Sequence, residues 1–221
     1  MELIEAIQNR KSIRGYKPVP VQKQILNNIL QVASRAPSGV NTQPWKFTVV
    51  AGEALEEIKF GNIKRFESGE SPHPDIPLES FTGIYKERQV DIAIQLFQLL
   101  GIAREDKEKR NDWMKKGGRF FDAPAAIIIS VDKSLGSERV MLAIGAVAQT
   151  IALTALNYDL GTCIQDQGIL YPEVVRKVTG IPESQRIAIC LSIGYPDWDF
   201  PANKLESSRE PVENCTTWCG I

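Results

Sequence analysis

The sequence feature that most constrains the fold is a continuous apolar run from Ala125 to Val131, which reads Ala-Ala-Ile-Ile-Ile-Ser-Val. Runs of this length, rich in β-branched residues and without polar alternation, are typical of strands that are buried on both faces. A second apolar run, from Arg186 to Ile193, has the same character. The chain is therefore predicted to contain a sheet whose central strands are covered on both sides.

Helical and strand patterns fill most of the remaining chain. Apolar residues recur at helical spacing or lie in short β-branched and aromatic runs, and no internal repeat or clear linker divides them. The predicted helices span residues 2–8, 21–36, 54–63, 85–100, 104–116, 137–158 (with Ser137 as its cap) and 172–179, and the other predicted strands span 45–50 and 162–165. These patterns predict one α+β domain over residues 1–221.

Two segments of this domain are predicted to lie outside the regular core. Residues from about 52 to 120 form an excursion that contains a turn-rich stretch with Pro72, Pro74 and Pro77. Long irregular segments in compact domains are usually lids or binding loops. The tail from about 195 to 221 is interrupted by prolines and is predicted to be an extended arm that lies on another part of the fold.

The charge and cysteine content disfavour several classes of function. The formal net charge is −1, with 26 basic and 27 acidic residues, so no global basic field exists to hold nucleic acid. The four cysteines lack the spacing of a structural zinc site, so no metal is expected and free thiols in a reducing cytosol are predicted. The single histidine, His73, lies in a Ser/Pro-rich run, which disfavours a histidine-dependent catalytic triad.

No secretory or membrane-spanning segment is expected. Glu2 and Glu5 interrupt the first residues, which is not the pattern of a secretory signal. The most apolar run, from Val140 to Leu156, carries three polar residues. A bilayer span needs about 20 predominantly apolar residues, so a buried central helix fits this run better. The predicted location is the cytoplasm, without membrane contact.

A basic motif, Arg10-Lys11-Ser12-Ile13-Arg14-Gly15-Tyr16, holds three cations and a hydroxyl within five residues. Arg10, Ser12 and Arg14 would share one face of a strand, because side chains alternate along an extended chain. In a helix Arg10 and Arg14 would still share a face, being four residues apart. In either conformation two guanidinium groups converge on a point that suits a multi-oxygen anion. A solvated basic patch is the alternative that the motif alone leaves open.

A polar loop, from Pro37 to Trp45, follows the second predicted helix. Ser38, Asn41 and Gln43 offer a hydroxyl and two amides, neutral groups that suit a polyol or the edge of a heteroaromatic ring. Gly39 allows the backbone to approach a ligand closely. An ordinary turn between a helix and a strand would contain the same residues, so this segment alone does not distinguish a ligand site from a turn.

Two further segments carry groups that could meet a ligand. Thr162 to Gly168 is a strand end that runs into a loop, where backbone N–H groups near Gln167 and Gly168 could reach a ligand atom. In the C-terminal arm, Arg209 lies near Lys204 and two serines, and these groups could close together on a phosphate.

Taken together, the four segments resemble the FMN-dependent nitroreductase family. The resemblance covers nearly the whole chain and rests on the order and spacing of the motifs at Arg10–Arg14, Pro37–Trp45, Gly161–Gly168, Gly194–Pro196 and Ser207–Pro211. The segment from Tyr85 to Pro124 is most similar to the branch that includes nitrobenzoate reductases.

This resemblance implies an α+β fold of nitroreductase type, with a central mixed, mostly antiparallel sheet flanked by helices. It also implies an intertwined homodimer with two FMN sites at its interface. Within one chain the expected FMN contacts are Arg10, Lys11, Ser12, Arg14, Gln167, Gly168, Ser207 and Arg209, and the partner chain is expected to add Pro37, Ser38 and Asn41. Many relatives carry a second cation where this chain has Ser207, and Lys204 is the candidate to replace it.

The activity implied by the resemblance is an oxidoreductase reaction in two half-reactions. NADH or NADPH would reduce the flavin and leave, and an electron-poor small molecule such as a nitroaromatic or quinone would then take the same place, so ping-pong kinetics are expected. No side chain need act as a nucleophile. Tyr85 and Phe120 are the predicted substrate contacts, with Arg119 and Phe121 as further candidates, although core packing is the alternative for both phenylalanines.

Two other functions remain open from the sequence. One is a flavin-dependent reductive dehalogenase, whose relatives bind an amino acid through a Glu, Tyr and Lys set; Glu79, Tyr85 and Lys86 match its spacing poorly. The other is a non-catalytic flavin-binding protein.

Overall fold

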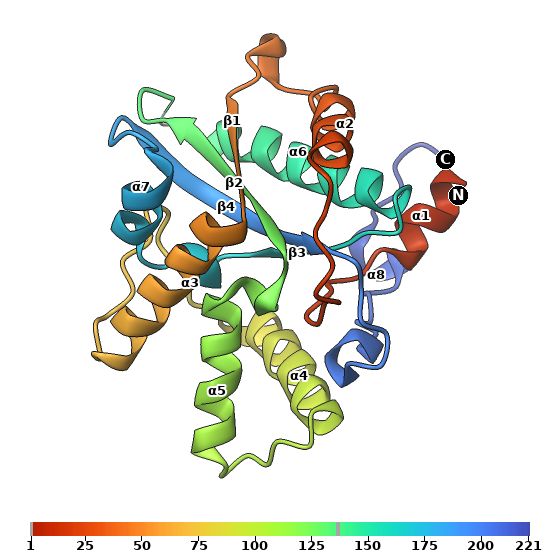
Figure 1. The fold of residues 1–221 in the computed structure, drawn as a ribbon. Helices are drawn as coiled ribbons and strands as arrows, with labels where there is room; N and C mark the ends of the chain where they lie inside the picture. Colours follow the sequence, from red (N-terminus) through yellow and green to blue (C-terminus); the bar gives the residue numbers. More distant parts are fainter. Residues whose placement is uncertain (1, 136–137) are drawn as a thin grey trace.

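The computed structural model describes residues 2–135 and 138–221, and within them four antiparallel strands form one sheet in the order β1-β2-β4-β3 (Figure 1). The strands are β1 (Trp45–Ala51), β2 (Ala125–Asp132), β3 (Gly161–Gln165) and β4 (Gln185–Gly194). The α+β class is confirmed. The expected mixed character is limited to one isolated parallel bridge, which joins Ser12 to Thr162 at the β3 edge.

The two apolar runs form the centre of the sheet, as predicted. Every residue of β2 except Asp132 is buried, and Ile128 pairs with Thr48 on one side and with Cys190 on the other. Successive side chains of a strand point to opposite faces. Ile127 and Ile129 accordingly enter one hydrophobic cluster and Ile128 enters another.

Helices cover both faces of this sheet. On one face α2 (Lys23–Ala33) and α6 (Glu138–Leu156) pack over Ile127 and Ile129, and on the other α3 (Gly52–Glu67) and α7 (Pro172–Thr179) pack over Ile128. The remaining helices are α1 (Leu3–Asn9), α4 (Gly83–Leu99), α5 (Lys107–Gly118) and α8 (Val212–Cys215), and the 3-10 turns are η1 (Gly39–Asn41), η2 (Phe120–Asp122), η3 (Gln167–Ile169) and η4 (Pro201–Lys204).

Local chemistry explains where helix bounds differ from those predicted. The charged helix begins at Lys107 rather than 104, because the Asp106 side chain caps it by accepting a hydrogen bond from the Lys109 N–H (3.0 Å). It continues through Gly117, where the predicted stop lies, and this buried glycine packs against the end of the Gln167 side chain. The predicted cap Ser137 lies outside the described residues.

Helix α6 passes a length and composition test for a membrane span, with a mean hydropathy of 1.7. Its buried residues, however, pack with α2 and the sheet in the main hydrophobic cluster, among them Val147, Ile151 and Ala155. The helix is therefore a core helix of this fold, as predicted.

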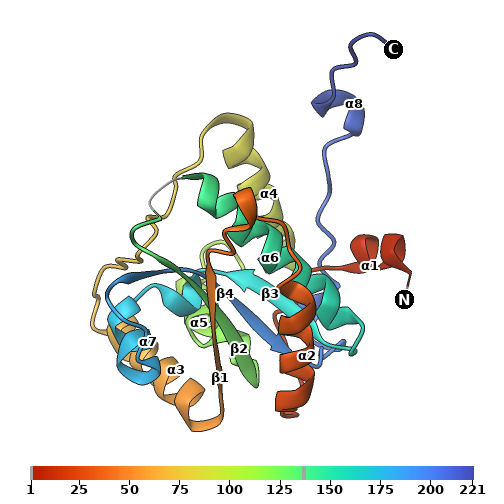
Figure 2. The ribbon, with the colours of Figure 1, turned by 90° about the horizontal axis from the view of Figure 1, so that it is seen from above.

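The segment after β4 divides into a packed part and an exposed part. Ala202 and Leu205 are buried with Leu96 of α4, Trp113 of α5 and Phe121 in a third hydrophobic cluster. From Glu206 to Cys215 every residue is exposed, and the tail extends away from the sheet and its helices (Figure 2). The segment after β4 is thus fixed in place as far as Leu205.

Candidate functional site

The basic motif from Arg10 to Tyr16 is extended and lies beside β3. The Ile13 N–H donates to the Thr162 carbonyl (2.9 Å), Ser12 forms a parallel bridge with Thr162, and Tyr16 forms an antiparallel bridge with Pro196. Ile13 points into the core with an exposed fraction of 2%. Because side chains alternate, Arg10, Ser12 and Arg14 share the opposite face. The extended conformation considered from the sequence is therefore the one observed.

One buried amide, Asn203, fixes this motif from the other side. Its Oδ1 accepts a hydrogen bond from the Arg14 N–H (2.7 Å), and its Nδ2 donates to the carbonyls of Gly15 (2.8 Å) and Asp197 (2.7 Å). The Asn203 side chain is 1% exposed, so water does not compete for these partners. Asn203 thus joins the N-terminal motif to η4, two segments that are far apart in the sequence.

The charges of the motif are largely uncompensated. The pKa of the buried Cys163 thiol is raised by burial, although Arg14, Ser12 and Arg10 oppose the shift, so the thiol beside them stays neutral. Among the described residues, Lys11 pairs with Glu206 (3.8 Å), but neither Arg10 nor Arg14 forms an ion pair. Two guanidinium groups without carboxylate partners, next to a neutral thiol, leave a local positive field that suits an anion.

A buried hydrogen-bond network holds the loop after β3. Gln165 donates from Nε2 to the Ser192 Oγ (2.9 Å) and accepts from the Gly168 N–H through Oε1 (3.0 Å). Asn62 of α3 donates to the Gly168 carbonyl (2.9 Å). A Cβ on Gly168 would lie 2.4 Å from the Phe120 ring, so only glycine fits. In this structure the Gly168 N–H is already bonded, and the Gln167 side chain packs against Gly117.

The predicted partner-chain contacts do not meet the basic motif within one chain. Pro37 and Ser38 precede η1 and Asn41 is its last residue; this turn projects beyond the end of the sheet opposite to the basic motif (Figure 1). The Ser38 Oγ accepts from the Gln43 N–H (2.9 Å), and Val40 is 97% exposed. Val40 also has a positive φ of 44°, which is costly for a β-branched residue.

The predicted contacts of the C-terminal arm form no hydrogen bond with Arg10, Ser12 or Arg14 among the described residues, although Lys11 pairs with the neighbouring Glu206. The Arg209 guanidinium donates to the Ser207 hydroxyl (2.7 Å) and to the Ser208 carbonyl (2.8 Å) on the same exposed arm. Lys204, the candidate replacement cation, is exposed on η4.

The two predicted substrate contacts differ in their exposure. Tyr85 is 64% exposed on the first turn of α4, whereas Phe120 is fully buried in the cluster with Leu55 and Ile58. The burial of Phe120 favours core packing over contact with a substrate, since its ring faces α3 and the Gly168 backbone. Arg119 is paired with Asp122 (2.7 Å). Phe121 is buried too, with its ring centroid 6.0 Å from the Arg14 guanidinium carbon.

His73 lies away from this site, where it tethers the loop before α4 to α7. Its Nε2 lies 2.8 Å from Glu173, and Arg65 pairs with both Glu173 (3.6 Å) and Glu70. Ligand atoms of Glu70, His73 and Glu173 lie within 4.8 Å of one another. The positive charge of Arg65 already offsets the negative charges of both carboxylates. We therefore interpret the cluster as a tether for the loop.

The tether predicts a pH-dependent contribution to stability. Hydrogen bonds to the Ser71 carbonyl and to Glu173 raise the pKa of His73 above the ordinary value of a histidine. A raised folded-state pKa stabilises the fold fully at pH values below the unfolded pKa, and this stabilisation is lost as pH rises through the folded pKa. The side chain is half exposed, so the effect should stay below about 1 kcal/mol. Urea midpoints of wild type and His73→Gln should differ near pH 5.5 and converge near pH 8.5; an equal difference at both would contradict the tether.

Sequence reasoning missed the residues that hold the site in place. Asn62, Gln165 and Asn203 are buried amides that bond to backbone groups of the basic motif or of the loop at Gly168. A polar residue inside a helix or at a strand end has no periodic signal. The one available signal was the apolar context of Asn203, between Ala202 and Leu205 in an otherwise polar tail.

Comparison with known proteins identifies the family of this chain. The model of the nitroreductase family matches residues 7–195. The chain is 31% identical to the nitrobenzene nitroreductase of Ectopseudomonas oleovorans, over 97% of this chain and 95% of that one. It is 29% identical to the 4-nitrobenzoate reductase of Nocardioides sp. (strain LMS-CY), over 99% of this chain and 90% of that one.

A solved structure of similar fold is the FMN and NADPH-dependent nitroreductase NfnB from sphigopyxis sp. strain HMH, with a TM-score of 0.95, 28% identity and full coverage of both chains. The FMN-dependent nitroreductase NfnB from Mycobacterium smegmatis, in complex with NADPH, has a TM-score of 0.92 and 25% identity over 98% of this chain and 97% of that one. The chain belongs to the nitroreductase family and is an oxidoreductase of that family.

Proposed function

We propose that this protein is an FMN-dependent oxidoreductase that uses NADH or NADPH to reduce nitroaromatic compounds. The observation that carries the proposal is the shared face of Arg10, Ser12 and Arg14, with two guanidinium groups that form no ion pair among the described residues. A phosphomonoester carries roughly −1.5 to −2 charges at neutral pH. Arg10 and Ser12 offer a guanidinium and a hydroxyl to such a phosphate, and the Arg14 guanidinium adds a second positive charge on the same face.

In this proposal the residues of the motif contact different parts of FMN. Arg10 and Ser12, joined by Arg209 once the arm turns toward them, hold the phosphate and ribityl chain. Arg14, whose backbone is fixed by Asn203, holds a positive charge at the pyrimidine edge of the ring, where negative charge gathers on reduction. When bound, FMN supplies the hydride transfer from nicotinamide to acceptor. Lys11 and Ser207 are secondary contacts, and the backbone around Gln167 and Gly168 borders the ring.

The proposed active form is a homodimer with a site at the interface. Pro37, Ser38 and Asn41 precede β1 at the end of the sheet opposite to the motif, and the exposed, strained Val40 is suited to contact a partner. Solvent-exposed apolar side chains also support a homodimer, since large exposed apolar patches mark interfaces. They are Leu3, Ile4 and Ile7 of α1, Leu142 of α6, and Val212, Trp218 and Ile221 of the arm.

The acceptor class follows from the relatives. The named relatives include a nitrobenzene nitroreductase, a chloronitrobenzene nitroreductase and two 4-nitrobenzoate reductases, and two solved structures are named as NADPH-dependent or bound to NADPH. The exposed Tyr85 on α4 is the proposed substrate contact; Phe120 is left out because it is buried.

Anaerobic titration of the purified protein with NADH and with NADPH tests the function. The proposal expects a flavin absorbance spectrum that one nicotinamide bleaches and that nitrobenzene then restores. A colourless protein that takes up no added FMN would contradict it. A flavin that neither nicotinamide bleaches would indicate a non-catalytic flavin protein, and turnover of a halotyrosine without nitrobenzene reduction would indicate a dehalogenase.

A further inference from the structure

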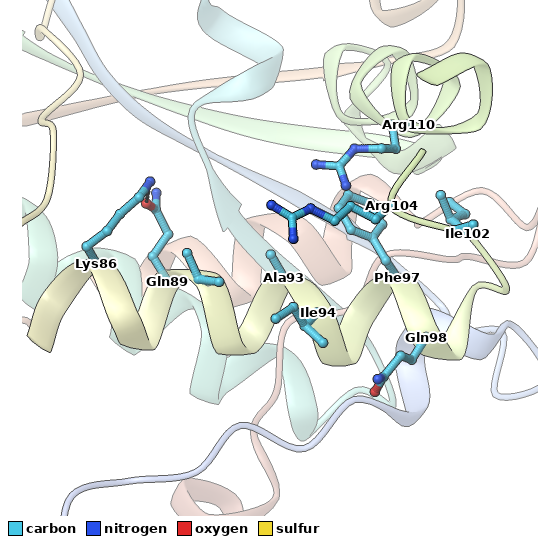
Figure 3. A pocket seen from close by; sticks show the side chains of 11 residues that line it. Lys86, Gln89, Ala93, Ile94, Phe97, Gln98, Ile102, Arg104 and Arg110 are labelled. Atoms are coloured by element: carbon cyan, nitrogen blue, oxygen red, sulfur yellow. Dashed lines mark hydrogen bonds between the residues drawn. The ribbon is translucent and has the colours of Figure 1, made fainter. Parts of the chain in front are cut away.

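A groove of about 760 Å³ lies between α4 and the segment that leads into α5 (Figure 3). Its floor is apolar and is formed by Val90, Ala93, Ile94, Phe97 and Ile102. Pockets of about 300 to 1,000 Å³ with apolar walls and a few placed polar groups are typical of small-molecule sites. The groove therefore has the size and floor of a ligand site.

The polar groups of the groove carry one sign of charge. Lys86, Arg104 and Arg110 line it, and among the residues that the structure describes no Asp or Glu does. All three cationic groups lie on the same side of α4 in Figure 3. None of the three takes part in an ion pair that joins described residues, whereas the neighbouring Lys109 is paired with Asp106 (3.1 Å). The groove thus concentrates positive charge that the chain itself does not offset.

Two of these side chains are held in place without losing their charge. The Arg110 guanidinium lies over the Phe97 ring, 4.6 Å from its centroid, and the Lys86 Nζ donates to the Gln89 Oε1 (2.8 Å). A guanidinium that stacks on an aromatic ring keeps its N–H donors free at its edge. Arg110 can therefore bind a planar anion while it stays stacked on Phe97.

We propose that this groove binds a small aromatic carboxylate. The ring would lie on the apolar floor near Ala93 and Phe97, and the carboxylate would accept charge-assisted hydrogen bonds from Arg104 and Arg110. An uncharged aromatic would leave the cations unused, and an aliphatic anion would not cover the floor. A carboxylate is charged whether or not the ring carries a nitro group. Binding in this groove can therefore be tested separately from the proposed redox function.

Calorimetric titration of the purified protein with benzoate tests the site, because benzoate has the required chemistry but no reducible group. Saturable binding is expected, with benzamide at least about tenfold weaker, since it lacks the charge that strengthens the hydrogen bonds. Binding should also weaken at about 0.5 M salt, because the groove is open to solvent. The absence of benzoate binding, or equal binding of benzamide, would overturn the proposal.

Matched variants locate the binding. Arg104→Gln and Arg110→Met each remove one guanidinium, and Met keeps an unbranched side chain over Phe97; each should weaken benzoate at least about tenfold. Lys107→Ala removes an exposed cation of α5, the helix that carries Arg110. Lys107 does not line the groove, so this variant should change the affinity for benzoate less than twofold. Circular dichroism verifies the fold. Unchanged affinity in both arginine variants, or displacement of benzoate by adenosine 2′,5′-bisphosphate, would overturn the proposal, whatever the result of the nicotinamide titration.

Discussion

Replacing Asn203 with leucine is expected to lower the free energy of unfolding by about 3–5 kcal/mol. The side chain is 1% exposed and bonds three backbone groups: the Arg14 N–H and the carbonyls of Gly15 and Asp197. Leucine has a similar volume but bonds none of them, so each stays buried without a partner. Unsatisfied buried groups cost about 1–3 kcal/mol each, and relaxation recovers part of the sum. Urea unfolding at one fixed protein concentration measures the loss.

Asn111→Ala is the matched control for this prediction. Asn111 is exposed on α5, so its loss should change the free energy of unfolding by less than about 0.5 kcal/mol. A loss below about 1 kcal/mol for Asn203→Leu would mean that the basic motif is held mainly by its pairing with β3. Under the present account the motif also shifts in that variant, so its affinity for FMN should fall together with its stability.

Replacing Arg10 with alanine is expected to weaken FMN binding by about ten- to a hundredfold while the chain stays folded. Arg10 is partly exposed at the end of α1 and forms no ion pair among the described residues, so its loss leaves no buried charge behind. A hydrogen bond between charged groups contributes about 1.5–3 kcal/mol, which corresponds to this range of affinity. Fluorescence titration of the apoprotein with FMN gives the dissociation constant.

Two further variants complete this test. Arg209→Ala should weaken FMN to a similar degree and leave a folded dimer, although Arg209 bonds only to its own arm in this structure and must turn to reach the phosphate. Arg139→Ala removes an exposed arginine from the first turn of α6 and should leave the affinity within twofold of wild type. An Arg10→Ala variant that binds FMN as wild type does would exclude Arg10 from the phosphate site.

The sheet and its helices were predictable because their signals are local. The unbroken apolar run of β2 indicates burial on both faces, and α7 carries Pro172 at its first position and Gly180 at its end, in the left-handed conformation. The bounds of α7 were predicted to the residue. The shared face of Arg10, Ser12 and Arg14 was predictable from their spacing, because side chains alternate along an extended chain; the motif alone left a solvated basic patch open as the alternative to an anion site.

The supports of the site and the groove were not predictable, because they depend on contacts between distant segments. Asn203 meets Arg14 across 189 positions, and Gln165 meets Ser192 across 27. Phe120 was predicted as a substrate contact in the excursion, with core packing as the alternative, and the structure buries its ring next to three successive residues with positive φ, Phe120 to Asp122. No sequence pattern signals such a backbone. The groove likewise needs the packed positions of α4 and α5.

The decisive measurement compares FMN with riboflavin, because Arg10 of the basic motif and Arg209 of the arm are proposed to hold a phosphate that riboflavin lacks. The two flavins differ only in that phosphate. The apoprotein is expected to bind FMN at least about a hundredfold more tightly than riboflavin, since the charge-assisted contacts of Arg10 and Arg209 are lost together. Equal dissociation constants for the two flavins would contradict it.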